Sequence, residues 1–226
     1  MLVYHEVTVV NPEEFVIKRR RKKYRFALFA NSPLCFEFDE WQQKPTDVVE
    51  LGAGNGLFSV ELASRYPDRQ FVAIDVKADR LQKGAKLASE RGLENISFVR
   101  ARVEDQLTNM FLPHSLQSIW VTFPDPFPKK RAATRRMTHP QFLKQYASLL
   151  TPNGSLYLKH DSRDFFHWSL EQLVAEKWQL RELSFDLHES ELSDDYKILT
   201  TYEQRWLGEG LVTNFVQAIP TIHPTK

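Results

Sequence analysis

Hydrophobic residues gather along this chain in short runs that alternate with longer amphipathic stretches. The short runs are typical of buried strands, and they cover residues 48–51, 71–74, 96–99, 119–123 and 155–158. Apolar positions with helical spacing predict helices over residues 57–65, 78–91, 104–111, 140–150 and 164–176. Two later segments, 178–187 and 201–207, are expected to be strands that close the sheet as a hairpin-like pair.

This alternation predicts an α/β fold. Strands separated by helices form parallel sheets with right-handed crossovers, so we expect a doubly wound, mostly parallel, seven-stranded sheet. Residues 1–45 lack the pattern and are predicted to form an irregular, basic N-terminal arm. The sheet domain is then expected to span residues 46–226.

Composition places the chain among ordinary globular proteins. Its 226 residues are 42% hydrophobic and 26% charged, which is typical of a single domain with a sizeable core. No apolar run reaches the about 18–20 residues of a membrane helix, and the first residues lack the layout of a signal peptide. The lone Cys35 cannot form an internal disulfide. We therefore expect a cytoplasmic protein that does not bind a membrane.

Charge is unevenly distributed along the chain, although the net charge is only +1. Seven of the eight residues 18–25 are cationic, and so are five of the eight residues 129–136. Acidic residues gather elsewhere, mainly in segment 186–195. Such segregation favours an electropositive surface for a polyanion. The histidines and the single cysteine show no metal-ligand spacing, so no metal site is expected.

Polar residues follow the predicted strands at the point where each one ends. They are Glu50, Asp75, Arg102, Asp125 and Asp161. Ligands of parallel sheets bind beyond the carboxyl ends of the strands. We therefore expect these side chains to surround one site.

A glycine-rich loop follows the first predicted strand and opens the first helix. Its glycines are Gly52, Gly54 and Gly56, whereas the dinucleotide fingerprint would need its third glycine at Leu57. This spacing favours a smaller adenosyl ligand over a pyrophosphate. Asp75 ends the next strand, where a carboxylate can accept hydrogen bonds from both ribose hydroxyls. Glu50 is placed to face an ammonium group or to hold the loop through its amides.

The stretch from Phe123 to Arg131 places Asp125 between two prolines and just before a cationic run. Proline fixes its own backbone and biases the preceding residue toward extended geometry, so this carboxylate sits on a stiff segment. A rigid acid beside a phosphate-attracting cluster is suited to reading a base in a nucleic acid.

With its glycine loop and Asp75, the chain resembles the class I S-adenosylmethionine-dependent methyltransferases, which have a Rossmann-like fold. Four later segments resemble one family of them, the tRNA (guanine-N7-)-methyltransferases. They are the stretch 123–131, its basic continuation through Met137 and Thr138, the strand end at residues 159–161, and segment 200–205. The similarity covers about residues 45–210.

This resemblance implies methyl transfer from S-adenosylmethionine to N7 of guanosine 46 in the variable loop of tRNA. It places cofactor contacts at Glu50, Gly52, Gly54, Gly56, Asp75, Arg102 and Asp125. Asp125 is also the implied catalytic residue. Substrate-binding positions fall on Lys129, Asp161, Thr200, Thr201, Tyr202 and Glu203. RNA contacts fall on Lys130, Arg131, Arg135 and Arg136.

Several positions depart from the family pattern. The family usually has Trp at the position of Phe127, His at Ala132 and Thr at His160. Many members carry an acid or amide where Arg102 stands, and a guanidinium cannot accept a hydrogen bond from the adenine amino group. Such a contact would then fall to backbone atoms or to Glu104 or Asp105.

These residue types suit N7 chemistry. Guanine N7 carries a free lone pair, so no general base is needed for the bond-forming step. Catalysis then depends on holding the base in line with the methyl group. Guanine N1–H and N2 are hydrogen-bond donors, and carboxylates at Asp125, Asp161 or Glu203 could read them.

Two other functions stay open on the sequence. One is a class I methyltransferase that acts on an exocyclic amine, although Asp125-Pro126-Phe127 lacks the second proline of that motif. The other is a non-catalytic RNA-binding protein with a residual cofactor loop. The sequence also leaves open a monomer or a homodimer.

Overall fold

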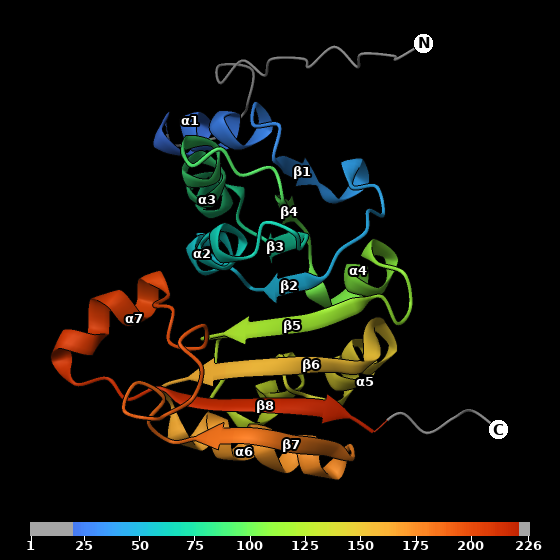
Figure 1. Cartoon of the computed structure of the whole chain (residues 1–226), viewed down its shortest axis with the longest axis vertical. Coiled ribbons are helices and arrows are strands. Elements are labelled where there is room, and N and C mark those ends of the chain that lie inside the picture. Colours follow the sequence, from blue (N-terminus) through green and yellow to red (C-terminus); the bar gives the residue numbers. More distant parts are fainter. Residues whose placement is uncertain (1–19, 222–226) are drawn as a thin grey trace.

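The computed structural model describes residues 20–221, with side chains from Tyr24 onward. Figure 1 shows one twisted sheet with helices on both sides. In chain order the elements are α1 (Arg20–Ala30), β1 (Cys35–Glu37), η2 (Phe38–Glu40), β2 (Val48–Leu51), α2 (Leu57–Arg65), β3 (Phe71–Asp75), α3 (Ala78–Glu90), β4 (Ile96–Arg100), α4 (Val103–Met110), β5 (Leu116–Thr122), η3 (Lys130–Arg135), α5 (Pro140–Leu149), β6 (Leu150–His160), α6 (Arg163–Ala175), β7 (Trp178–Ser184), α7 (Thr201–Trp206), η4 (Leu207–Glu209) and β8 (Asn214–Pro220).

The sheet of the described residues has the strand order β1-β4-β3-β2-β5-β6-β8-β7. Strands β1 to β6 pair in parallel, and β8 pairs antiparallel with both β6 and β7. The chain runs outward from β2 to β3 and β4, then returns to place β5 on the other side of β2. Ligands bind where strand order reverses in this way, so the expected site lies beyond β2 and β5.

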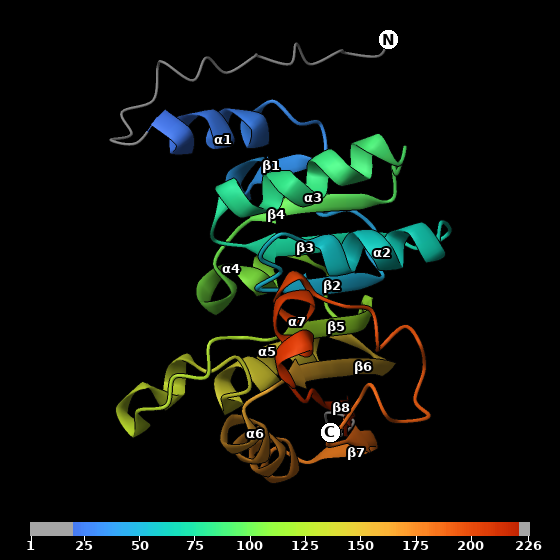
Figure 2. The same cartoon turned by 90° about the vertical axis from the view of Figure 1, so that its left-hand side faces the viewer.

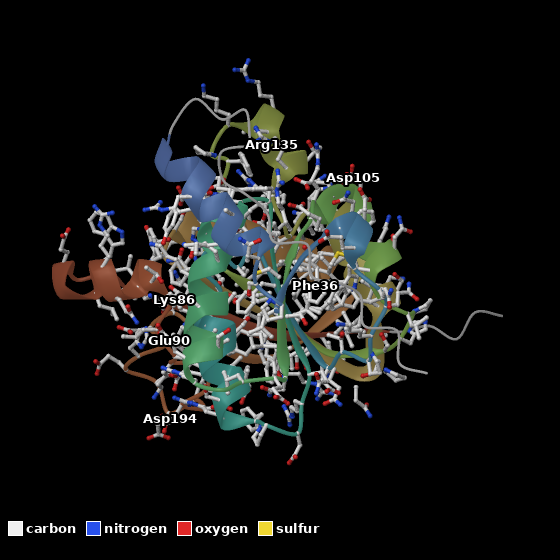
Figure 3. The ribbon with its side chains drawn as sticks, turned by 90° about the horizontal axis from the view of Figure 1, so that it is seen from above. Phe36, Lys86, Glu90, Asp105, Arg135 and Asp194 are labelled. Atoms are coloured by element: carbon white, nitrogen blue, oxygen red, sulfur yellow. The ribbon has the colours of Figure 1, made fainter. Side chains whose placement is uncertain are left out.

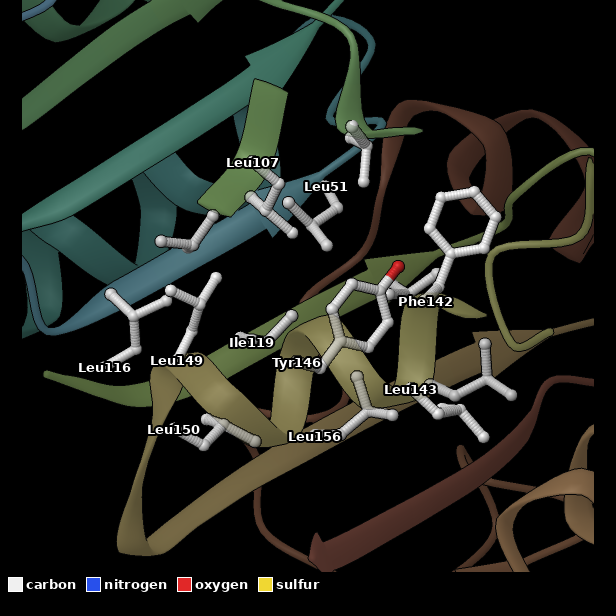
Figure 4. Packing of buried hydrophobic residues seen from close by; sticks show 14 of the residues in the cluster. Leu51, Leu107, Leu116, Ile119, Phe142, Leu143, Tyr146, Leu149, Leu150 and Leu156 are labelled. Carbon is white, nitrogen blue, oxygen red and sulfur yellow. The ribbon is translucent and has the colours of Figure 1, made fainter. Parts of the chain in front are cut away.

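Two hydrophobic cores fill the space between the sheet and its helices. Helices α1, α2 and α3 cover one face, and α4, α5 and α6 cover the other (Figures 1 and 2). Figure 4 shows Phe142, Tyr146 and Leu149 of α5 packed over Ile119 of β5 and Leu156 of β6. These side chains are all but inaccessible to solvent, so burial of apolar surface holds the sheet and helices together.

The sequence-based prediction of the α/β class and of a mostly parallel sheet is confirmed. The five predicted helices agree with α2, α3, α4, α5 and α6 to within one residue at each end. The first five predicted strands overlap β2, β3, β4, β5 and β6, and the sixth overlaps β7.

The predicted strand over residues 201–207 is wrong. This segment forms α7, because Thr200 and Glu203 make a capping box in which each side chain binds the backbone of the other. The sheet instead ends with β8, which inserts between β6 and β7. With β8 and the short β1, the described part of the chain has eight strands rather than seven.

The prediction of an irregular arm is wrong for residues 20–40. Residues 20–30 form α1, which packs on α3, and β1 adds a parallel edge strand beside β4. Phe29 and Cys35 are buried in the core under this helix. Residues 1–19 and the side chains of residues 20–23 lie outside the described part, and so does most of the basic run 18–25. The boundary at residue 45 stays a prediction.

Candidate functional site

A cavity of about 660 Å³ opens at the carboxyl ends of β2, β5 and β6. One wall is the glycine loop, the second is the segment after β5, and the third is α7 with the residues before it. Figure 1 shows α7 facing the ends of β5 and β6. The volume lies within the range of small-molecule sites. The cavity therefore lies where the strand order predicts a ligand.

The three glycines of the loop all adopt left-handed backbone. Their φ angles are 68° at Gly52, 57° at Gly54 and 66° at Gly56, a region that glycine reaches without steric cost. A Cβ at Gly56 would also lie 2.7 Å from the ring of Phe98. The backbone conformation therefore favours glycine at all three positions, and packing excludes a side chain at Gly56.

Asp75 anchors this loop. Its Oδ2 accepts the amide of Gly54 at 2.9 Å, and its Oδ1 accepts the amide of Lys77 at 2.8 Å. Burial raises the pKa of this carboxyl, and the two amide hydrogen bonds act against that rise. Asp75 is buried and does not itself line the main cavity. Each of its carboxylate oxygens keeps a second lone pair, which leaves an acceptor for a ribose hydroxyl that reaches it from the loop side.

Glu50 lies at the base of the cavity, almost fully buried. Its two oxygens accept hydrogen bonds from the hydroxyls of Ser59 at 2.6 Å and of Thr122 at 2.7 Å. Burial raises the pKa of Glu50 to about 7, even though both hydroxyls favour the charged form. Sequence reasoning missed Ser59 and Thr122, since isolated hydroxyl residues carry no distinctive signal.

Asp125 is exposed and faces the main cavity from the segment after β5. Phe123 and Phe127 flank it with left-handed φ angles of 48° and 42°. Each such residue costs about 1–3 kcal/mol and persists only where the surrounding structure holds it in place. The segment is thus bent back at both ends, and Asp125 lies at its middle.

The cationic run forms the 3₁₀ helix η3, which projects from the body of the protein (Figure 2). Lys129, Lys130 and Arg131 are exposed, and so is Arg135, whose guanidinium lies 4.3 Å from the centre of the Phe127 ring. In Figure 3, Arg135 lies at the edge of the molecule, well apart from Lys86 and Glu90 of α3. The side chains of these four cations are exposed to solvent, where a polyanion could reach them.

Arg136 differs from the other cations of the run. Its guanidinium donates to the carbonyl of Phe127 at 3.1 Å and lies 4.3 Å from the centre of the Trp168 ring. The predicted RNA contact thus has an internal partner. Arg136 thus contacts the C-terminal end of residues 123–127, which we call the Asp125 segment.

Helix α7 brings Thr200, Thr201 and Tyr202 to the cavity. The hydroxyl of Tyr202 donates to Oδ2 of Asp161 at 2.9 Å, which joins the helix to the end of β6. The side-chain amide of Asn55 in the glycine loop donates from Nδ2 to the hydroxyl of Thr201 at 3.3 Å. Four of the predicted substrate positions therefore meet at this wall.

Glu203 does not reach the cavity. It has no solvent-exposed surface, and its Oε2 accepts from Nζ of Lys159 and the amide of Thr200, both at 2.8 Å. Its Oε1 lies 3.1 Å from Nε2 of His188 and 3.3 Å from the hydroxyl of Thr213. The expectation that Glu203 reads guanine is wrong for this structure, because the side chain has no exposed surface and each of its oxygens already has two partners inside the protein.

Arg102 lines a second cavity of about 500 Å³, beyond the ends of β3 and β4. Val76, Glu37 and Asp39 line the same cavity. The Arg102 side chain pairs with Asp105 at 3.6 Å, and its amide donates to Oε1 of Gln106 at 2.7 Å. Arg102 is therefore apart from the main cavity that Asp125 lines.

Two further features of the described residues concern membrane-spanning helices and metal-binding groups. Within residues 20–221, no helix has the length and apolar character that crossing a bilayer requires. The same residues contain no group of three His, Cys, Asp or Glu side chains arranged for a metal ion.

The sequence of this chain is similar to the sequences of known methyltransferases. A family model described as "Putative methyltransferase" matches residues 44–214. A tRNA (guanine-N(7)-)-methyltransferase from Brevibacillus brevis is 35% identical over 190 residues, which cover 82% of this chain and 87% of the relative. The enzyme of the same name from Bacteroides thetaiotaomicron is 32% identical and is covered to 85%, with 88% of this chain aligned.

Solved structures resemble the fold. The 16S rRNA methyltransferase KamB superposes with a TM-score of 0.60 at 18% identity, over 79% of this chain and 89% of KamB. A SAM-dependent methyltransferase from Aquifex aeolicus superposes with a TM-score of 0.53 at 12% identity, over 78% and 83% of the two chains. At such low identity the likeness shows the fold, a Rossmann-like methyltransferase fold.

Proposed function

This chain belongs to the tRNA (guanine-N7-)-methyltransferase family, and we propose that it transfers a methyl group from S-adenosylmethionine to N7 of guanosine 46 in the variable loop of tRNA. The observation that carries the proposal is a single cavity lined by both the glycine loop and Asp125. A donor loop and a base-reading acid would then meet at one place, as methyl transfer requires.

The cavity suits an adenosyl ligand. The left-handed glycines leave the loop backbone bare, and Asp75 and Glu50 stand at the ends of adjacent strands. Asp75 would accept from the ribose, and Glu50 would face the ammonium of the methionine end. When bound, S-adenosylmethionine supplies an electrophilic methyl group.

The chain's own task is then to orient guanine. Asp125 would accept hydrogen bonds from the edge of the base away from N7, with Asp161 as a second acceptor. Methylation leaves positive charge on the imidazole ring, which a nearby carboxylate stabilises. Lys129, Lys130, Arg131 and Arg135 would bind phosphates and bring the RNA to the site.

The raised pKa of Glu50 leads us to expect that ligand binding releases a proton. Because burial raises its pKa to about 7, Glu50 is largely protonated at pH 6, and a ligand ammonium would favour the ionised form. Binding of S-adenosylhomocysteine at pH 6 should therefore release a proton from most molecules, and affinity should rise with pH up to about 7 and level off above it. Titration calorimetry in buffers of different ionisation enthalpy measures this release. Glu50→Gln should abolish it, and equal release by this variant would contradict the assignment.

Paired substitution of the exposed cations should weaken the electrostatic part of RNA binding. Each lost phosphate contact lowers the slope of log Kd against log salt by ~0.7–0.9. Lys130→Ala/Arg131→Ala should therefore reduce the slope by about 1.5, measured by filter binding with unmodified tRNA. The exposed pair Lys83→Ala/Lys86→Ala on α3 is the matched control and should leave the slope unchanged. An unchanged slope in the first variant would mean that η3 is only a solvated turn.

The function itself is tested by methyl transfer to unmodified tRNA, followed by cleavage specific for 7-methylguanosine. We expect cleavage at the variable loop. Methyl incorporation without such cleavage would indicate another acceptor, such as an exocyclic amine. A chain that binds tRNA but shows no calorimetric signal with the cofactor would be a non-catalytic RNA-binding protein. The cytoplasmic location and the choice between monomer and homodimer stay predictions.

A further inference from the structure

His160 is a buried histidine whose two ring nitrogens have different partners. Nε2 lies 2.9 Å from the carbonyl oxygen of Pro124, and Nδ1 lies 2.8 Å from the amide nitrogen of Ser162. Nδ1 also lies 3.2 Å from Oδ1 of Asp161, a longer contact than the one to the amide. A carbonyl only accepts and an amide N–H only donates, so Nε2 carries the hydrogen and Nδ1 is the acceptor. The ring is therefore neutral and fixed in one tautomer. Burial, which lowers the pKa of His160, agrees with this state.

The contact falls on a segment that has few backbone hydrogen-bond donors of its own. Pro124, Pro126 and Pro128 have no N–H to donate, and Phe123 and Phe127 adopt left-handed backbone. In the described part of the chain, side chains bind this segment at two carbonyls, His160 at Pro124 and Arg136 at Phe127. Asp125 lies between these two points.

We propose that His160 is a positioning residue for the methyl transfer, because its Nε2–H holds the carbonyl of Pro124 and thereby sets the direction of Asp125. This inference rests on the proposed function. The ring also contacts Phe165 of α6, with centroids 4.4 Å apart, so the hold is transmitted from the packed body of the protein to the exposed segment. His160 itself need not touch the RNA.

The neighbouring residue extends the hold to the opposite wall. Asp161 follows His160 directly, and its Oδ2 accepts from the hydroxyl of Tyr202 on α7. At the end of β6, His160 thus contacts the segment that carries Asp125, and Asp161 contacts α7. Two walls of the cavity are therefore positioned by adjacent residues of one strand end.

Two amide variants separate the ring's contacts. Glutamine places an N–H near the position of Nε2 and can still donate to Pro124, whereas asparagine reaches only the position of Nδ1 and can still accept from Ser162. We expect His160→Gln to keep kcat for tRNA methylation within about threefold of wild type. His160→Asn and His160→Phe should lower kcat about ten- to a hundredfold, with KM for both substrates within about threefold. The exposed His167 of α6 supplies the control, since His167→Phe should leave kcat unchanged.

Two readouts do not depend on activity. Long-range ¹H–¹⁵N spectra of the wild-type protein should show the Nε2–H tautomer for His160, and an Nδ1–H tautomer would overturn the inference without any variant. The amide of Phe123, which donates to the carbonyl of Lys159, should exchange faster in His160→Asn but not in His160→Gln.

The outcomes are distinguishable. Equal loss of kcat in the glutamine and phenylalanine variants would mean that only the ring's packing matters, and unchanged kcat in His160→Asn would also overturn the inference. If the wild-type protein does not methylate tRNA, the proposed function fails. The tautomer and the exchange of Phe123 would then still decide whether His160 holds the segment.

Discussion

Asp125→Asn is expected to lower kcat for tRNA methylation about a hundredfold while the Kd for tRNA stays within about threefold. The side chain is exposed in the main cavity, and asparagine keeps its size but loses its charge and one acceptor. The loss falls mainly on the transition state, because positive charge develops on the guanine ring as the methyl group is transferred. Phosphate contacts at η3 are unchanged, so binding should persist.

Single-turnover kinetics and a filter-binding titration on the same unmodified tRNA would measure both quantities. The exposed Asp186, in the loop after β7, is the matched control, and Asp186→Asn should behave as wild type. Equal losses of binding and turnover in Asp125→Asn would remove this residue from the chemistry and assign it to RNA binding alone.

Glu203→Ala is expected to lower the free energy of unfolding by about 3–5 kcal/mol, because it leaves the buried ammonium of Lys159 without its counter-ion. Burial lowers the pKa of Lys159, and the contact with Glu203 is the main influence that favours its charged form. For a chain of this size the loss corresponds to a fall in Tm on the order of 10 °C. Activity should also fall, since Glu203 fixes the start of α7 and with it Tyr202.

Thermal and urea denaturation would measure this loss. Glu209→Ala in η4 removes an exposed carboxylate nearby and should change Tm by less than about 2 °C, in line with ordinary surface substitutions. The double variant Lys159→Met/Glu203→Leu removes both charges and should regain part of the lost stability. A single variant as stable as wild type would show that the pair contributes nothing to the fold.

The burial of Glu203 changes which residues are available to read guanine. Of the three carboxylates considered from the sequence, Asp125 and Asp161 line the cavity and Glu203 does not. The family-like segment 200–203 thus divides into two roles. Thr200, Thr201 and Tyr202 form the wall, and Glu203 holds that wall in place.

Much of the fold could be read from local sequence. Strand β2 and helix α2 agree with their predicted ranges residue by residue, because apolar periodicity and the glycines between them act over a few positions. The capping box of Thr200 and Glu203 was also present in the sequence, as a Thr-x-x-Glu pattern, and would have predicted α7. Tyr202 and Trp206 in this segment belong to residue types that are common in strands, but the capping box and the packing of the segment decide for a helix.

The sequence by itself therefore determined the mostly parallel α/β sheet, the glycine loop and the row of polar residues at the strand ends. Each of these features can be recognised from patterns within single strands, helices and loops. The tertiary structure decided which polar side chains contact one another. Lys159 meets Glu203 across 44 positions, and His160 meets Pro124 across 36. Burial of Glu50 beside Thr122, 72 positions away, raises its pKa. Such pairings follow from strand order and packing, which no local pattern records, and they decide which polar groups face the cavity and which only hold it in shape.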